Sequence, residues 1–370
     1  MIQDTRELVV GSRIAEQLRS AARERLVRRA PEHGQASGGV RVVRPTAPQE
    51  PVDGDSIIDT HDLRRTFRGR GGEVEAVRGV DLRVRAGQIF GFLGPNGAGK
   101  TTTLRMLATL LVPTAGEARV AGADLRREPA TVRERIGYVP QGGSTDPAET
   151  GRRELLIQGR LYGMSGHEAA DRAREVLAAL DLESAADRTT GTWSGGMRRR
   201  LDIGLGIVHR PRLLFLDEPT TGLDPQARAR MWDEIRRLRA GGTTVFLTTH
   251  YLEEADALAD RLAIIDHGRL VAEGTADELK RQVAGDVVTL GVDGTADAVL
   301  AAVRDQPFVR EAAADDGVIR LYVDRGEAAV PSLLRLLDGA GLAPQTITLA
   351  RPSLDDVFLR QTGRSLREEE

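Results

Sequence analysis

The stretch GPNGAGKT, from Gly94 to Thr101, decides the fold of this chain. It fits the pattern G-x-x-x-x-G-K-[ST], a P-loop whose glycines let backbone N–H groups turn toward phosphates. In this pattern the lysine, here Lys100, reaches the β- and γ-phosphates, and the hydroxyl of Thr101 binds Mg²⁺. Only two of the 52 basic residues are lysines, which indicates that a compact ammonium is needed where a planar guanidinium would not fit. The predicted nucleotide-binding residues are Gly94, Pro95, Asn96, Gly97, Ala98, Gly99, Lys100, Thr101 and Thr102.

The residues on both sides of the P-loop have the character that the motif requires. Gln88–Leu93 (QIFGFL) predicts a short buried strand, and Thr102–Leu111 (TTLRMLATLL) predicts a helix with an apolar stripe. From Ile57 to about Ala284, β-rich runs alternate with helical patterns. The sequence therefore predicts an α/β fold, a P-loop NTPase core with a mostly parallel sheet and an antiparallel β portion.

Composition narrows the class of protein. A chain of 370 residues is too long for one ordinary core, so we expect two domains, and a net charge of −3 gives no reason to expect a nucleic-acid partner. The absence of cysteine excludes disulfides and thiolate metal sites and fits a reducing cytosol. Apolar runs are far shorter than the roughly 18 residues that a membrane span needs. We expect a chain that does not cross a bilayer by itself and carries no export signal.

The first three quarters of the chain divide into an extension and a nucleotide-binding domain. Residues 1–55 are interpreted as an extension, disordered or partly helical, because Arg13–Arg29 has only a ragged apolar face and Pro31–Asp55 is rich in Pro, Gly and polar residues. Residues 56–284 are the predicted nucleotide-binding domain. Within it, residues 146–187 are a predicted helical insert, with helices at Arg152–Tyr162 and Gly166–Leu180.

Residues 285–361 are predicted to form a small ferredoxin-like (α+β) accessory domain, followed by a charged tail at 362–370. The pattern runs β-α-β-β-α-β, over Val287–Val292, Thr295–Arg304, a strand around Val309, Val318–Val323, Glu327–Ala340 and Thr346–Ala350. Ser353 opens a last helix through Arg360, with Asp356 in place of the Glu or Gln of a capping box.

An acidic pair follows an apolar strand far downstream of the P-loop. Arg212–Glu218 reads RLLFLDE, and carboxylates at the carboxyl end of such a strand point toward the phosphate site of an α/β sheet. Asp217 can hold Mg²⁺, and Glu218 can orient the attacking water or accept its proton. We therefore predict Glu218 as the catalytic carboxylate.

A second anion-binding turn lies between these elements. Trp193–Leu201 reads WSGGMRRRL, and small residues at a helix N-terminus expose backbone N–H groups to an anion. The arginines Arg198–Arg200 are interpreted as a solvated helix face rather than as phosphate ligands. A second anion turn beside an existing phosphate loop requires an explanation.

The motif set resembles that of ATP-binding subunits of ABC transporters. It comprises GPNGAGKT, YVPQ ending at Gln141, WSGGM at 193–197, LLFLDEP from Leu213, TGLD at 221–224 and TTH ending at His250. The phrases SGGMRRRLDI and LTTHYLEEAD, with PSLDDVFLRQTGRS near the C-terminus, resemble bacterial daunorubicin-resistance exporter ATPases. Trp193 and Met197 depart from the commonest signature, and Met197 agrees with the drug-resistance subgroup.

The resemblance implies a composite site. Ser194, Gly195, Gly196 and Met197 would complete the ATP site of a second, identical subunit, which explains the second anion turn. Asp224 would bridge the dimer interface, and His250 would contact the γ-phosphate. Thr101, Gln141 and Asp217 would serve Mg²⁺, and Gln141 would also report to the membrane subunit. Phe67 matches the position of an aromatic that stacks on adenine, although packing under a hairpin is a rival role and the insertion Arg68–Gly72 departs from the pattern.

The implied partners are a second ATP-binding subunit and a separate integral membrane permease, with the helical insert as the docking surface and the chain at the cytoplasmic face of the membrane.

Two alternative functions stay open. A soluble ABC ATPase of translation usually carries two cassettes, whereas this chain has one P-loop; chromosome types need a long coiled coil, whereas about 90 residues without sustained heptads separate Lys100 from Ser194. A nucleotide-gated regulatory module would show ATPase activity that no membrane partner affects.

Overall fold

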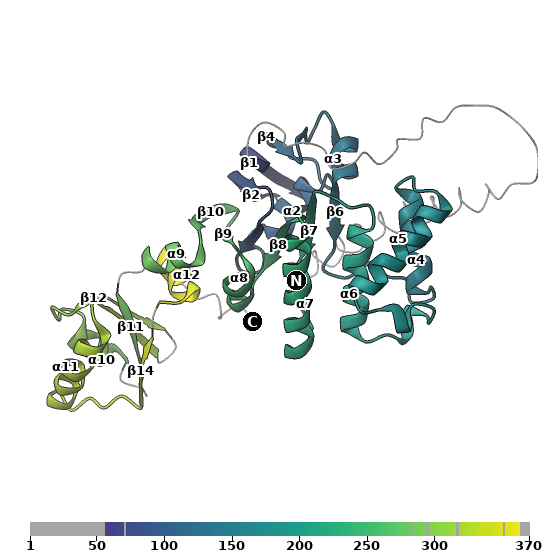
Figure 1. Cartoon of the computed structure of the whole chain (residues 1–370). Helices are drawn as coiled ribbons and strands as arrows, with labels where there is room; N and C mark the ends of the chain where they lie inside the picture. The colour runs from purple at the N-terminus through teal and green to yellow at the C-terminus, as the bar shows by residue number, and fades with distance from the viewer. Residues whose placement is uncertain are drawn as a thin grey trace, which may run out of the picture.

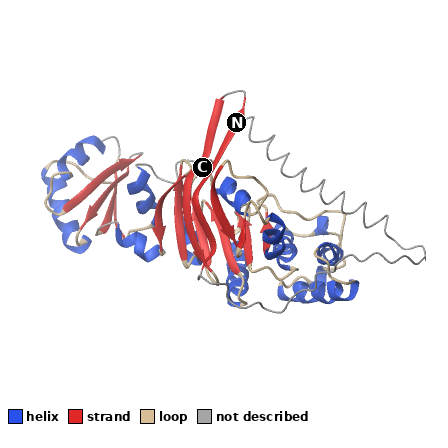
Figure 2. Cartoon of the chain, turned by 90° about the horizontal axis from the view of Figure 1, so that it is seen from above, coloured by secondary structure: helices blue, strands red, loops and turns tan. Residues whose placement is uncertain are grey.

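The computed structural model describes residues 56–69, 72–282, 285–292, 296–315, 318–350 and 352–362. The predicted N-terminal helix at Arg13–Arg29, the linker after it and residues 363–370 of the tail lie outside the described residues. Three parts follow one another in space: a helical part, a pair of larger sheets around the P-loop, and a small sheet covered by helices (Figure 1). The same order is visible from above, with the two larger sheets stacked side by side in the middle (Figure 2).

The central sheet has the order β10-β9-β3-β8-β7-β6, and its strands are parallel except for β10. Its central strands are buried along their whole length, as is typical of parallel strands covered on both faces. Phe246 lies between Phe90, Phe92 and Phe215, with ring centroids 5.5–5.6 Å apart. The strands are β3 (Ile89–Leu93), β6 (Ile136–Val139), β7 (Leu213–Asp217), β8 (Thr244–Thr249), β9 (Arg261–Asp266) and β10 (Arg269–Gly274).

A second, antiparallel sheet has the order β2-β1-β4-β5 and shares its core with the central sheet. Alternate residues of β2, among them Val80, Leu82 and Val84, are buried, whereas their neighbours are exposed. Leu104 and Leu107 of the helix after the P-loop lie in this shared core. The strands are β1 (Ser56–Gly69), β2 (Gly72–Arg85), β4 (Ala115–Val120) and β5 (Ala123–Asp124), and the helices around the two sheets are α2 (Lys100–Leu107), α3 (Pro129–Arg135), α7 (Pro225–Ala240), α8 (Leu252–Leu258) and α9 (Ala276–Gln282).

The helical part contains α4 (Gly151–Leu161), α5 (Gly166–Ala179) and α6 (Gly195–Ile207), with short 3₁₀ turns at Glu183–Ala185 and Thr190–Thr192. Apolar side chains of α4, α5 and α6 form one cluster that also includes Trp193. Helix α5 begins with a capping box, because Ser165 and Glu168 bond to each other's backbone N–H. Helix α6 begins at the predicted anion turn, with Ser194 as its N-cap. Because α6 packs in this cluster, the turn is supported by an apolar core distinct from the core of the two sheets.

The C-terminal part confirms the predicted ferredoxin-like order. Its antiparallel sheet has the order β12-β13-β11-β14, and two helices pack against that sheet through their own apolar cluster. The elements are β11 (Asp286–Gly291), α10 (Ala296–Val303), β12 (Val309–Asp315), β13 (Val318–Val323), α11 (Gly326–Gly339) and β14 (Thr346–Ala350).

The last helix, α12 (Leu354–Thr362), returns to the nucleotide-binding part. Leu354, Val357 and Phe358 pack in one cluster with Leu93 of β3 and Leu279 of α9. Figure 1 shows α9 and α12 side by side between the small sheet and the central sheet. The predicted cap is present, because Ser353 N donates to Asp356 Oδ2 at 2.8 Å and Asp356 N donates to Ser353 Oγ at 3.3 Å.

Candidate active site

The P-loop wraps around the ammonium of Lys100. Gly97 and Gly99 have φ of 79° and 105°, the left-handed region that favours glycine. A Cβ on Gly99 would lie 2.5 Å from the carbonyl oxygen of Ala76 on β2, so this position has no room for a side chain. Lys100 Nζ donates to the carbonyl oxygens of Gly94 and Pro95 at 2.8 and 3.0 Å. The strand, loop and helix predicted around the motif are β3, residues 94–99 and α2.

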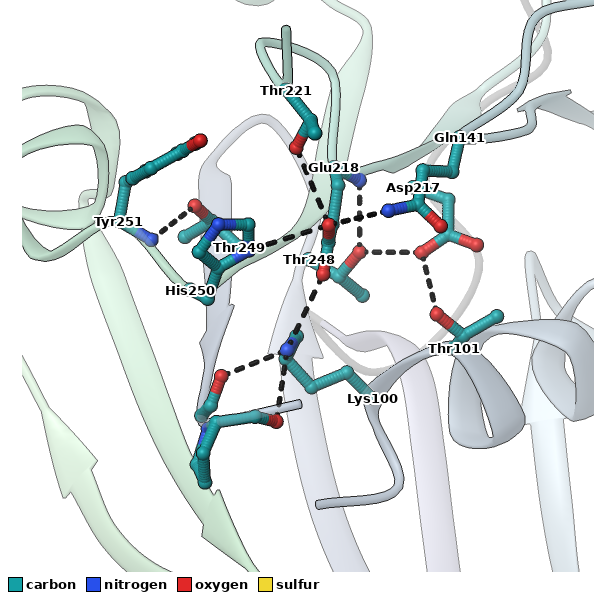
Figure 3. Close-up of polar contacts among 12 residues, drawn as sticks. Lys100, Thr101, Gln141, Asp217, Glu218, Thr221, Thr248, Thr249, His250 and Tyr251 are labelled. Atoms are coloured by element: carbon teal, nitrogen blue, oxygen red, sulfur yellow. Dashed lines mark hydrogen bonds and ion pairs between the residues drawn. The ribbon is translucent and has the colours of Figure 1, made fainter. Parts of the chain in front are cut away.

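The acidic pair ends β7 beside this loop (Figure 3). Asp217 Oδ1 accepts hydrogen bonds from Thr101 Oγ1 at 3.0 Å and from Thr248 Oγ1 at 2.7 Å. Thr248 also accepts from the backbone N–H of Glu218, at 3.1 Å. One hydroxyl on β8 thus holds both acidic residues. Thr248 has no role predicted from the sequence, although its place in the TTH motif, two residues before His250, is a signal for one.

Glu218 is the centre of the polar cluster in Figure 3. Its Oε1 lies 3.3 Å from Lys100 Nζ, and its Oε2 accepts from Gln141 Nε2 at 2.7 Å and lies 3.3 Å from His250 Nδ1. Thr221 Oγ1 donates to the same Oε2 at 3.3 Å. The φ of Glu218 is 44°, a strained value for a residue with a side chain, and such strain is typical of functional sites.

The two carboxylates have opposite pKa shifts. Burial raises the pKa of Asp217, and the hydrogen bonds from Thr248 and Thr101 only partly oppose this effect. Burial also acts to raise the pKa of Glu218, but the His250 ring and the Lys100 ammonium outweigh it and hold that pKa below its ordinary value. Glu218 is therefore an ionised carboxylate at neutral pH, which is the form that a base requires.

The residues around Asp217 fit a bound Mg²⁺. Within the described residues, Asp217 Oδ2 is buried and accepts no hydrogen bond, although a buried carboxylate oxygen normally has a partner. The Thr101 hydroxyl and the Gln141 side chain lie on either side of the acidic pair (Figure 3). The Thr101 hydroxyl, the Gln141 amide and the Asp217 carboxylate all offer oxygen atoms as metal ligands. Mg²⁺ prefers oxygen ligands, so these residues are chemically suitable for that ion.

The signature residues lie in a separate groove. Ser194 is the N-cap of α6, where its Oγ accepts from the backbone N–H of Met197 at 3.2 Å. Asp224 caps α7 in the same way, through Ala227 N at 2.9 Å. A groove of about 270 Å³ is lined by Ser194, Gly195, Gly196, Met197 and Asp224, and no P-loop residue lines it.

Phe67 lies apart from both groups, on β1. It pairs with Val74 of β2, two residues before Ala76, whose carbonyl borders Gly99. The guanidinium of Arg65 lies 4.6 Å from the centre of its ring. Phe67 lies near the end of the β1–β2 hairpin, where Gly69 pairs with Gly72.

The expectation of a solvated face for Arg198–Arg200 is wrong for the middle residue. Arg199 is only 7 % exposed, and its guanidinium donates to backbone carbonyls beside Gln141 and beside the acidic pair. Burial lowers the pKa of Arg199, but its guanidinium stays charged, because arginine is not deprotonated in proteins. The error arises because three adjacent helical residues point in three directions, and sequence alone does not show which direction faces the core.

A parallel sheet with a P-loop after β3, an acidic pair at the end of β7 and a separate serine-glycine groove define an ATPase of the ATP-binding-cassette class. Comparison with known proteins agrees. The ABC transporter family matches residues 77–221, and the family described as ATP-binding protein DrrA1-3-like, C-terminal domain, matches residues 274–362.

Three similar proteins match more than four fifths of this chain. The daunorubicin resistance ATP-binding protein DrrA3 of Streptomyces coeruleorubidus is 46% identical over 302 residues, 81% of this chain and 95% of that protein. The daunorubicin/doxorubicin resistance ATP-binding protein DrrA of Streptomyces peucetius is 46% identical over 311 residues, 83% and 92% of the two chains. The linearmycin resistance ATP-binding protein LnrL of Bacillus subtilis is 36% identical over 315 residues, 84% and 100%.

A solved dimeric ATP-binding cassette, in a post-hydrolysis state with ADP and phosphate, is similar with a TM-score of 0.55 and 25% identity, over 59% of this chain and 98% of that one. This chain belongs to the ABC transporter family of ATP-binding proteins, in the branch with the DrrA-type C-terminal domain. The family expected from the motifs is confirmed, and the chain is an ATP-binding and ATP-hydrolysing subunit of a transporter. Among the described helices, none is long and apolar enough to span a membrane.

Proposed function

We propose that two copies of this chain enclose two ATP molecules head to tail, with Lys100 of one copy opposite Ser194 of the other. The separation of the two phosphate-binding features carries this proposal, because the groove beside Ser194 has no P-loop residue in its lining. Arg200 and Arg230 also line the groove, so it is suited to an anion. The similarity to a dimeric cassette that holds ADP and phosphate supports the same arrangement.

In phosphoryl transfer, negative charge spreads over the equatorial oxygens of the transferred group. The protein would therefore act mainly by positioning water and phosphate and by stabilising this charge, without a covalent intermediate. Glu218 would orient the attacking water and accept its proton, and Lys100 and His250 would stabilise the negative charge. Thr101, Asp217 and Gln141 would hold Mg²⁺, which neutralises phosphate charge when it is bound. Asp224 would bridge the two copies, and Phe67 would stack on adenine.

We infer that the transported compound is a hydrophobic drug or antibiotic that leaves the cell through a separate permease. The inference rests on similar proteins that are named for daunorubicin, doxorubicin and linearmycin resistance. The chain would act at the cytoplasmic face of the membrane, with the helical part against the permease and Gln141 linking that contact to Glu218. The 2.7 Å bond from Gln141 to Glu218 supports this link.

The proposed dimer is tested with the variant Glu218→Gln. Light scattering in the presence of ATP and Mg²⁺ measures its molar mass and so distinguishes a monomer from a dimer. Removal of the base stops hydrolysis, so the variant should remain an ATP-bound dimer, whereas Glu117→Gln, an exposed change on β4, should cycle as the wild type does. Full steady-state ATPase activity in Glu218→Gln, or a monomer at saturating ATP, would contradict the proposal.

Export is tested in the native cell with daunorubicin, whose fluorescence reports its accumulation. Cells that contain only the Glu218→Gln chain should accumulate more of the compound than wild-type cells. Equal accumulation would reject export of this class of compound. ATPase activity that is the same with and without the membrane fraction would favour a nucleotide-gated regulatory module instead.

A further inference from the structure

Arg199 occupies an unusual position on the signature helix α6. It lies five residues after Ser194, yet its side chain points away from the signature groove, because Arg199 does not line that groove and is almost completely buried. All three nitrogen atoms of its side chain donate to backbone carbonyls. Nε donates to Pro219 at 2.9 Å, Nη1 to Pro140 at 2.6 Å, and Nη2 to Asp217 and Glu218 at 3.0 and 3.2 Å.

These carbonyls belong to two loops of the hydrolysis site. One loop carries Gln141, and the other carries Asp217 and Glu218. A single guanidinium thus joins the start of α6 to the backbone beneath the side chains that are proposed to act on ATP. The second loop includes the strained φ of Glu218, so Arg199 also helps to hold that conformation.

A second attachment strengthens the first. Asp202, one turn along α6, accepts from the backbone N–H and the hydroxyl of Ser144 at 2.6 and 3.0 Å. Ser144 follows Gln141 in the same loop, and Asp202 Oδ2 lies 4.0 Å from Arg199 Nη1. One buried face of α6 therefore contacts the Gln141 loop at two points and the acidic loop at a third.

We propose that Arg199 is a positioning residue that couples the signature turn to Glu218 and Gln141 of the same subunit, and so couples the two ATP sites of the dimer. The coupling between sites rests on the composite dimer proposed above. In that dimer, the N-terminus of α6 faces the partner's ATP, whereas Arg199 reaches the loops around the subunit's own ATP. A shift of α6 on contact with one nucleotide is thus transmitted to the catalytic carboxylate of the other site.

The conservative variant Arg199→Lys tests the geometry while it keeps the charge. An ammonium cannot reproduce the planar fork that reaches both loops at once. Since no Arg199 contact involves the P-loop, we expect the affinity for ADP to stay within about threefold of wild type. In the same variant kcat should fall about 10- to 100-fold, because misplaced catalytic groups have costs of this size. The Hill coefficient for ATP hydrolysis should fall from above unity to unity.

The control is Arg236→Lys, an exposed arginine on α7, which should leave kcat and the Hill coefficient unchanged. Circular dichroism melts select an assay temperature at which both variants are fully folded. A lower kcat with an unchanged Hill coefficient would overturn the coupling, since Arg199 would then act within one site only. An unchanged kcat would overturn the positioning role altogether.

A second measurement separates this proposal from the dimer itself. Trp193, directly before Ser194, packs against Gly151 and is a fluorescent reporter of the signature turn; Trp232→Phe removes the other tryptophan. With monomeric protein and ADP, binding at Lys100 should change Trp193 emission, and Arg199→Lys should abolish the change at saturating ADP. Emission that responds equally in both proteins would overturn the link within a subunit. A wild-type chain that never dimerises with ATP would instead reject the proposed function and the coupling between sites.

Discussion

Lys100 Nζ lies 3.3 Å from Glu218 Oε1, and both side chains are almost fully buried. The cation that is expected to bind the β- and γ-phosphates is therefore paired with the carboxylate that is expected to act as the base. The phosphates and the Glu218 carboxylate compete for one ammonium, which also donates to the carbonyl oxygens of Gly94 and Pro95. Nucleotide binding and release of Glu218 from Lys100 should be linked events.

This competition predicts that Glu218→Gln binds ADP more tightly than wild type. The neutral amide no longer attracts Lys100, so we expect about a tenfold gain, equivalent to about 1.4 kcal/mol. Isothermal titration calorimetry with ADP measures it without any dimer. The exposed variant Glu117→Gln should bind as the wild type does, and equal affinity in all three proteins would show that the pair does not oppose binding.

Asp217 should lower stability at neutral pH. Because burial raises its pKa above that of the unfolded chain, its contribution is fully present below the unfolded pKa and is lost as pH rises through the folded pKa. Asp217→Asn removes the buried charge, so its melting temperature near neutral pH should exceed that of wild type by about 2–4 °C. The gain should shrink as pH falls and should vanish well below the unfolded pKa of 3.8, where the carboxyl is neutral in both states.

The matched control for this change is Asp233→Asn, whose side chain is 65% exposed. Its melting temperature should differ little from wild type at any pH, because surface substitutions are nearly neutral. Scanning calorimetry without added Mg²⁺ measures the effect. A lower melting temperature for Asp217→Asn at neutral pH would mean that its Thr101 and Thr248 contacts stabilise the charged form more than burial opposes it.

Glycine substitutions should distinguish the two phosphate-binding features. A Cβ on Gly195 meets nothing within 4 Å, and Gly195 lies in the first turn of α6, so Gly195→Ala should fold at least as stably as wild type. The methyl group should nevertheless block the partner's phosphate and abolish ATP-driven dimers. Gly99→Ala, with positive φ and a 2.5 Å contact, should instead destabilise the P-loop itself. Melting curves and light scattering measure the two effects, and normal dimers of Gly195→Ala would remove Gly195 from the interface.

The sequence predicted the elements whose residues are neighbours along the chain. The P-loop, the acidic pair and the strand Thr244–Thr249 were recognised because each contains its strand and its polar end in one short stretch. The helix predicted at Thr102–Leu111 starts earlier and ends at Leu107. Its apolar pattern continues, but Thr109 has a φ of 62° and Leu110 is 54% exposed, so those apolar residues do not extend the helix.

Features that depend on distant contacts could not be predicted. The direction of Arg199 depends on carbonyls at the ends of β6 and β7, which are far away in sequence. The final helix was predictable from the cap at Ser353, but the packing of α12 in one cluster with Leu93 of β3, Val287 of β11 and Tyr322 of β13 follows only from the tertiary fold. Short-range patterns show that a face is buried, and not what covers it.

His209 should make folding stability depend on pH. It follows α6, its Nε2 lies 2.9 Å from the carbonyl oxygen of Ile136, and its ring stacks on Tyr162 at 3.6 Å. Burial lowers its pKa from 6.5 to about 4. A depressed pKa means that this contribution is present above 6.5 and is lost as pH falls toward about 4, because the unfolded chain binds the proton first.

We therefore expect His209→Gln to lose less stability than wild type when the pH falls from about 7 to about 5, with a difference of up to about 1.4 kcal/mol per pH unit below 6.5. Glutamine can still donate to Ile136, although it loses the stacking, so the slope with pH and not the absolute stability is diagnostic. Urea unfolding at the two pH values measures that slope. His167→Gln, at a side chain that is 88% exposed, should keep the wild-type slope. Equal slopes for His209→Gln and wild type would show that His209 takes up its proton inside the folded chain as readily as outside it.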